Sequence, residues 1–160
     1  MLYLIRHADA VSDENDDVRP LSAAGRAQVR RLAAFLKGGQ GMVLDEVWHS
    51  PLVRALETAA LLAEEMDWKG PVRAVPGLLS GDEPTLIASR LKAPRSIALV
   101  GHEPHLSGLA SLLVAGSSEP SLFLMRKCAI LALERQRAGA AGCWAVRWQI
   151  APELLDSAPP

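Results

Sequence analysis

Met1-Leu2-Tyr3-Leu4-Ile5-Arg6-His7-Ala8 opens the chain and joins an apolar run directly to an arginine and a histidine. The run has the length and composition of a buried β-strand. Arg6 and His7 then fall at the exit of that strand. A guanidinium there can bind phosphate oxygens, and a neutral imidazole can attack phosphorus or move a proton. The stretch therefore predicts a strand that ends in a phosphate-handling site.

Two later segments repeat this arrangement. Ile97-Ala98-Leu99-Val100-Gly101-His102 is a second apolar run that ends in a histidine, and Arg54 comes shortly after another strand-like segment. In open α/β sheets, ligands bind at the carboxyl ends of the strands. We therefore expect Arg6, His7, Arg54 and His102 to meet at one edge of a sheet.

The size and composition of the chain set limits on its class. Its 160 residues predict a single domain over residues 1–151, followed by a flexible tail over residues 152–160. With 49% hydrophobic residues and a net charge of −1, it has enough apolar residues for a core but no basic surplus for nucleic-acid binding. The first apolar run is too short for a membrane span or a signal peptide.

The two cysteines, Cys128 and Cys143, are too few for a disulfide framework and do not have the spacing of a zinc site. We therefore expect free thiols and a cytoplasmic protein.

Apolar periodicity and turn residues predict alternating strands and helices. The order predicts a three-layer α/β/α sandwich with a mainly parallel, mixed central sheet. Strands are expected at residues 2–6, 46–49, 72–75, 96–100, 129–134 and 144–150, the last two as an antiparallel pair around a turn at residues 139–142. Helices are expected from an N-cap at Ser22 to Gly38, at residues 52–66, at residues 84–91, and from residue 104 or 107 to residue 115. Residues 13–17 are predicted to form an exposed loop.

Four ordered motifs give the chain a specific resemblance. Leu4-Ile5-Arg6-His7-Ala8, Ser50-Pro51-Leu52-Val53-Arg54-Ala55-Leu56-Glu57-Thr58-Ala59 and Val100-Gly101-His102 are similar to the R-H-G, S-P-x-x-R-A-x-x-T-A and late G/S-H motifs of the histidine phosphatase, or phosphoglycerate mutase-like, superfamily. Arg19-Pro20-Leu21-Ser22 and Gly101-His102-Glu103-Pro104 resemble the SixA-type protein phosphohistidine phosphatases within it. The family usually has glycine where this chain has Ala8, and alanine loses easy access to positive φ.

The resemblance implies a phosphatase that works through a phosphohistidine intermediate. His7 is expected to be the nucleophile, with one ring nitrogen fixed by a backbone carbonyl. Arg6 and Arg54 are expected to bind the phosphoryl oxygens and His102 to stabilise their charge. Arg19 is expected to add a third guanidinium, although a plain loop arginine is the alternative, and Ser50 to contact the substrate. Because arginines supply the positive charge, no metal or other cofactor is expected.

The general acid stays open. Ester substrates need an acid to protonate the leaving group, whereas the imidazole of phosphohistidine leaves readily once its ring is protonated. The candidates are Asp9, Asp82, Glu83 and Glu103, of which we favour the last three; Asp9 has loop anchoring as its alternative role.

A chain of this length has little room for a helical insertion over the site. An open site favours a phosphorylated side chain on a protein, such as a phosphotransfer or kinase domain in signal transduction. The function expected is therefore that of a phosphohistidine phosphatase with no nucleic-acid or membrane partner. The alternatives are a small-molecule phosphomonoester phosphatase and a catalytically weak phosphoprotein-binding module.

Other charged and aromatic-ring residues have structural interpretations. His49 is expected to flank the pocket, and His105 to lie on the surface. Arg26, Arg30 and Arg31 are expected to form a solvated helix face that could help to dock an acidic phosphoprotein.

Overall fold

The computed structural model describes residues 1–39, 42–91, 95–136 and 144–155. Its strands form one sheet in the order β3-β2-β4-β1-β5-β6. The pairs among β1 to β4 are parallel, whereas β5 pairs antiparallel with both β1 and β6. The mainly parallel, mixed sheet is therefore confirmed. The strands are β1 (Leu2–Arg6), β2 (Glu46–His49), β3 (Val72–Ala74), β4 (Ile97–Gly101), β5 (Ile130–Arg135) and β6 (Trp144–Ile150).

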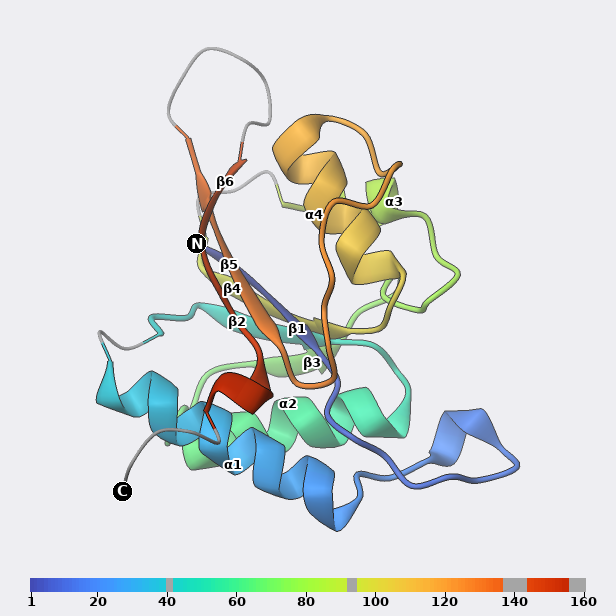
Figure 1. Ribbon diagram of the computed structural model, residues 1–160, viewed down its shortest axis with the longest axis vertical. Coiled ribbons are helices and arrows are strands. Elements are labelled where there is room, and N and C mark those ends of the chain that lie inside the picture. The colour runs from blue at the N-terminus through green and yellow to red at the C-terminus, as the bar shows by residue number, and fades with distance from the viewer. Residues whose placement is uncertain (40–41, 92–94, 137–143, 156–160) are drawn as a thin grey trace.

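Helices cover both faces of the sheet. Helices α1 (Ala23–Gly38) and α2 (Val53–Glu65) lie on one face, and α3 (Pro84–Ala88) and α4 (His105–Ala115) lie on the other (Figure 1). Helix α3 ends earlier than predicted, because the amides of Arg90 and Leu91 donate to carbonyls three residues back instead of four. None of the helices in the described segments combines the length and hydrophobicity that a membrane-spanning helix needs.

Two short 3-10 helices differ from what the sequence predicted. η1 (Asp16–Val18) lies partly in the predicted exposed loop, and the Asn15 side chain caps its start. η2 (Pro152–Leu154) lies in the predicted tail, and Pro152 is buried. Residues 156–160 of that tail, the predicted turn at residues 139–142 and Cys143 lie outside the described residues. Cys128 is a buried free thiol, and burial raises its pKa to about 12.

Each buried strand contributes to two hydrophobic cores, because successive side chains of a strand point to opposite faces. Leu4 of β1 and Leu99 of β4 pack toward α4, whereas Ile5 and Val100 pack toward α1 and α2. This two-sided burial explains the continuous apolar runs of β1 and β4.

The parallel pairing brings the ends of β1, β4 and β2 to one edge of the sheet. His7, Ser50 and His102 directly follow these strands and leave the sheet side by side. Helix α1 connects from β1 on one face, and α4 follows β4 on the other (Figure 1). In open α/β sheets, ligands bind at the carboxyl ends of two neighbouring strands whose connections run to opposite faces of the sheet. Here these strands are β1 and β4, so we expect the ligand crevice at their carboxyl ends.

The loop after β1 packs closely against the start of α1. Ser22 caps α1 by accepting a hydrogen bond from the Gly25 amide at 3.0 Å, and its hydroxyl donates to Asp9 at 2.6 Å. A Cβ atom at Gly25 would lie 2.0 Å from the carbonyl oxygen of Asp9. Glycine at this position therefore lets α1 approach the backbone two residues after His7.

Replacing Gly25 with alanine should lower the free energy of unfolding by about 1–3 kcal/mol, because the new methyl group overpacks this contact. Urea unfolding measures the change. Gly38→Ala in the same helix is the control, since no atom lies within 4 Å of its Cβ position. Equal stabilities of the two variants would contradict this account of the loop.

Candidate active site

The ring of His7 is buried and held in one orientation. Its Nδ1 lies 2.7 Å from the carbonyl oxygen of Ala8. A carbonyl oxygen can only accept, so Nδ1 carries the proton and Nε2 of the neutral ring keeps its lone pair. The prediction that a backbone carbonyl fixes the tautomer is confirmed.

Ala8 fits the backbone without strain. Positive φ angles among the described non-glycine residues occur at Asp67 and Cys128, and not at Ala8. The Ala8 amide donates to the Thr58 hydroxyl at 3.1 Å, and that hydroxyl donates to the carbonyl of Arg54 at 2.6 Å. Helix α2 therefore holds the backbone next to His7, and alanine serves here as well as glycine.

The surroundings of His7 keep its ring neutral. Burial, which is the largest cause, and the charges of Arg54, Arg6 and Lys127 together lower the pKa of His7 to about 4, against the opposing effect of the hydrogen bond to Ala8. The ring is therefore unprotonated near neutral pH. Neutral imidazole is the form that attacks phosphorus.

His102 faces His7 across the crevice. The two ring centroids lie 5.0 Å apart with the planes tilted by 52°. Nε2 of His102 shares a hydrogen bond with the Ser50 hydroxyl at 2.8 Å. Burial, which is the largest cause, acts with the nearby His7 and Arg54 to lower the pKa of His102 to about 3, against the opposing charge of Asp16. A phosphoryl group in the crevice brings negative charge, which favours the protonated ring and a hydrogen bond to the anion.

The arginines of the motifs surround these rings. Arg6 donates from Nη1 to the Met125 carbonyl at 2.9 Å, and Arg54 is 7% exposed. The Nε atoms of both side chains are buried and have no hydrogen-bond partner among the described residues. Two cationic groups with free donors therefore lie at the crevice.

Asp16 in η1 joins two of the predicted phosphate-binding arginines. Arg54 donates from Nη2 to the Asp16 carboxylate at 2.8 Å and from Nη1 to its backbone carbonyl at 2.6 Å. Nε of Arg19 lies 3.0 Å from the other carboxylate oxygen. Burial raises the pKa of Asp16, but Arg54 and Arg19 hold it below its ordinary value, so the side chain is ionised. Asp16 thus satisfies two donors of Arg54 that the sequence assigned to a phosphoryl group, whereas Nε of Arg19 is ion-paired with the carboxylate but makes no hydrogen bond among the described residues.

The family model of the histidine phosphatase superfamily (branch 1) matches residues 2–79. This match spans just under half of the chain, and it agrees with the motifs that resemble those of the histidine phosphatase superfamily. Phosphohistidine phosphatase SixA from Escherichia coli (strain K12) is 27% identical over 163 residues, which cover 98% of this chain and 97% of that protein. The structure of the protein histidine phosphatase SixA complexed with tungstate aligns with a TM-score of 0.84 at 26% identity, over 96% of this chain and 98% of that one. Together these similarities indicate a phosphatase, which is a hydrolase that removes phosphoryl groups.

Another solved structure shares the fold alone. The alpha-ribazole phosphatase from Shigella flexneri aligns with a TM-score of 0.76 at 19% identity, over 94% of this chain and 96% of that one. Phosphatases named for different substrates thus share this fold. The fold therefore does not specify the substrate, which must be inferred from the site.

The predicted acids lie in different places. Glu103 accepts hydrogen bonds from the amide and the hydroxyl of Ser107, burial raises its pKa, and the charge of Arg6 opposes that rise. Asp82 accepts from the Leu79 amide at 2.8 Å, and Glu83 directly precedes α3. Both Asp82 and Glu83 act on His105, whose pKa their charges raise against the larger effect of its burial. Glu103 is thus the predicted acid whose pKa responds to the charge of Arg6, one of the predicted site residues.

Asp9 anchors the loop after β1, which is the predicted alternative to its acting as the general acid. Its carboxylate accepts from Lys127 at 2.6 Å and from Ser22 at 2.6 Å. The hydrogen bonds and the Lys127 charge hold the pKa of Asp9 below its ordinary value.

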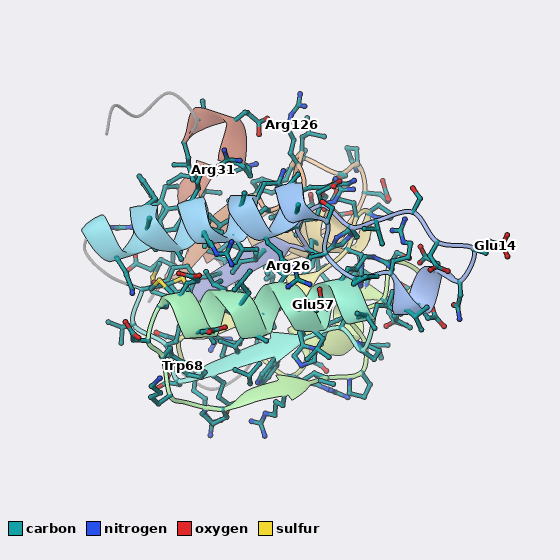
Figure 2. All side chains as sticks on the ribbon, turned by 90° about the horizontal axis from the view of Figure 1, so that it is seen from below. Glu14, Arg26, Arg31, Glu57, Trp68 and Arg126 are labelled. Carbon is teal, nitrogen blue, oxygen red and sulfur yellow. The ribbon has the colours of Figure 1, made fainter. Side chains whose placement is uncertain are left out.

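One prediction about exposure was wrong. His105 is buried at the start of α4, because α4 packs between the sheet and α3 and most of its residues are buried. The arginines of α1 are exposed or partly exposed to solvent, as predicted, and two of them also form ion pairs with α2: Arg26 with Glu57 at 3.0 Å and Arg30 with Glu65 at 3.1 Å. Figure 2 shows Arg26 and Glu57 where α1 and α2 meet.

His49 flanks the site as predicted. It is buried, and its Nδ1 donates to the Ser50 carbonyl at 2.8 Å. Within residues 1–39, 42–91, 95–136 and 144–155, no three His, Cys, Asp or Glu side chains come together in a way that could hold a metal ion.

Asp16 should compete with oxyanions for Arg54 and Arg19. We expect Asp16→Asn to bind tungstate roughly fivefold more tightly, because an amide pairs more weakly with a guanidinium than a carboxylate does. Isothermal titration calorimetry measures the affinity. Asp17→Asn is the matched control, since it removes the same charge from the next residue. Unchanged affinity in Asp16→Asn, or an equal gain in both variants, would contradict a competing role.

Proposed function

We propose that this protein hydrolyses phosphohistidine on a partner protein, with His7 as the nucleophile. The observation that supports this most is the buried, neutral His7, whose protonated Nδ1 is held by Ala8 while Nε2 keeps its lone pair. Arg6, Arg54 and His102 surround that ring. The similarity to phosphohistidine phosphatase SixA over nearly the whole chain adds independent support.

In the first step, the lone pair on Nε2 of His7 forms a bond to phosphorus. The bond between phosphorus and the substrate's ring nitrogen breaks, and its electron pair returns to that nitrogen, which takes up a proton. Arg6 and Arg54 neutralise the oxygens of the transferring group. The negative charge of the phosphoryl group favours protonation of His102, and the protonated ring donates a hydrogen bond to one phosphoryl oxygen. Donors of this kind commonly lower the activation barrier by roughly 3–4 kcal/mol.

In the second step, water attacks the phosphorus atom of phosphorylated His7. The phosphorus–nitrogen bond breaks, its electrons return to Nε2, the water loses a proton and inorganic phosphate leaves. Nδ1 keeps its hydrogen bond to Ala8 throughout, so the same ring nitrogen is regenerated for the next cycle. Arg19 and Ser50 contact the phosphoryl group or its carrier once Asp16 has released Arg54.

The proposed substrate is a phosphotransfer or kinase domain that carries phosphohistidine in cytoplasmic signal transduction. An imidazole leaving group needs little help from a protein acid, which fits a site whose one carboxylate between the arginines, Asp16, is ionised. One observation favours ester hydrolysis as a second candidate. Burial raises the pKa of Glu103, which suits a carboxyl group that must hold a proton for an alkoxide.

Phosphate release from three substrates separates these functions. We expect wild-type protein to release phosphate from a phosphohistidine-bearing phosphotransfer domain much faster than from a phosphoserine peptide or p-nitrophenyl phosphate. His7→Ala should lose at least about a thousandfold in rate, because a lost nucleophile removes the covalent route. Faster wild-type turnover of the two esters would favour the second candidate.

Two controls accompany this experiment. Tungstate binding and urea unfolding show whether His7→Ala keeps its fold and its anion site. Glu103→Gln discriminates between the leaving groups: ester hydrolysis should fall if Glu103 is the acid, while phosphohistidine hydrolysis should change little. Full activity of folded His7→Ala on phosphohistidine would contradict the proposed mechanism.

A further inference from the structure

A basic hollow lies beside the proposed phosphoryl site. Arg6, Gln28, Arg126, Lys127 and Glu153 line a space of about 650 Å³ at the surface. Arg6 lines this hollow and also belongs to the proposed site, so the two are continuous. The proposed mechanism gives no role to Arg126 or to Gln28.

The segment that carries Arg126 and Lys127 is fixed against the end of β1. The Cys128 amide donates to the Arg6 carbonyl at 3.1 Å, and Arg6 donates from its side chain to the Met125 carbonyl at 2.9 Å. The charge of Lys127 also reaches His7. A partner that contacts this segment therefore lies within reach of the proposed nucleophile.

Arg126 is the cation of the hollow that is most available to a partner. Its ion pair with Glu153 has an N–O distance of 2.9 Å, and the two side chains are 68% and 50% exposed. Ion pairs this exposed contribute little net stability, so another carboxylate can replace Glu153 at small cost. Lys127 is held more firmly, because its partner Asp9 is also bound by Ser22. Figure 2 shows Arg126 beside η2, projecting from the surface.

We propose that this hollow docks an acidic segment of the phosphoprotein substrate, with Arg126 as its main contact. The proposal rests on the proposed function and adds a recognition site outside the phosphoryl pocket. Three cations and one carboxylate line the hollow, so it complements a segment that brings carboxylates. The docked segment holds the partner while its phosphohistidine reaches His7.

Charge reversal at Arg126 tests the docking. At low ionic strength, Arg126→Glu should lower kcat/KM for a phosphohistidine-bearing acidic phosphotransfer domain roughly tenfold, through a higher KM. Turnover of phosphoramidate, a small compound with the same phosphorus–nitrogen bond, should not change. The difference should shrink in about 1 M salt, where charges are screened beyond roughly 3 Å.

Arg147→Glu is the matched control. Arg147 pairs with Glu134 at 3.0 Å, with side-chain exposures of 59% and 43%, so this variant makes the same charge change in a similar ion pair away from the hollow. Equal losses in Arg126→Glu and Arg147→Glu, or an equal loss with phosphoramidate, would overturn the docking proposal.

A binding assay keeps the docking separate from the chemistry. Fluorescence anisotropy of a labelled glutamate- and glycine-containing peptide should show weaker binding to Arg126→Glu and tighter binding to Glu153→Gln, which frees Arg126. If the peptide binds Arg126→Glu and Glu153→Gln with the same affinity as the wild-type protein, the docking proposal is overturned. Failure of the wild-type protein to cleave either phosphorus–nitrogen substrate would instead refute the proposed function, and the peptide assay would still decide the docking.

Discussion

The hydrogen bond between Nδ1 of His7 and the Ala8 carbonyl is the constraint on which the site depends. It leaves Nε2 as the ring nitrogen with a lone pair, and burial keeps the ring unprotonated. The carbonyl is itself fixed from two directions. Thr58 holds the Ala8 amide from α2, and the close approach of Gly25 in α1 holds the next residue along the chain. Two helices that follow different strands thus support a single side-chain orientation.

The concentration of positive charge imposes a second constraint. Arg6, Arg54 and Lys127 all act on His7, and like charges brought together at a buried site oppose folding. In the structure, Asp16 relieves part of this cost by bridging Arg54 and Arg19. A phosphoryl group that enters the crevice offers the same arginines more negative charge than one carboxylate does. The free protein and the substrate complex therefore balance the same cations in different ways.

The sequence predicted the elements and residues whose signals are local. The apolar runs predicted β1 and β4, and the motifs named Arg6, His7, Arg54 and His102, which the parallel strand register brings to one edge. Contacts between distant segments had no such signal. Asp16 is exposed as predicted, but its contact with Arg54 had no local signal because Arg54 lies on another helix. The burial of His105 results from the packing of α4, which the sequence alone does not show. The residues after Ala88 have a helix-like composition, so nothing in the sequence indicated that α3 ends there.

Trapping the phosphorylated enzyme tests the central claim most directly. The protein would be mixed with a phosphohistidine-bearing phosphotransfer domain, quenched within its first turnovers, digested and examined by mass spectrometry and ³¹P NMR. The account predicts a phosphoryl group on Nε2 of His7, acid-labile as expected for a phosphorus–nitrogen bond, and lost when water completes the cycle. Phosphate release without any phosphorylated His7, or a phosphoryl group on another residue that turns over at the rate of catalysis, would contradict it.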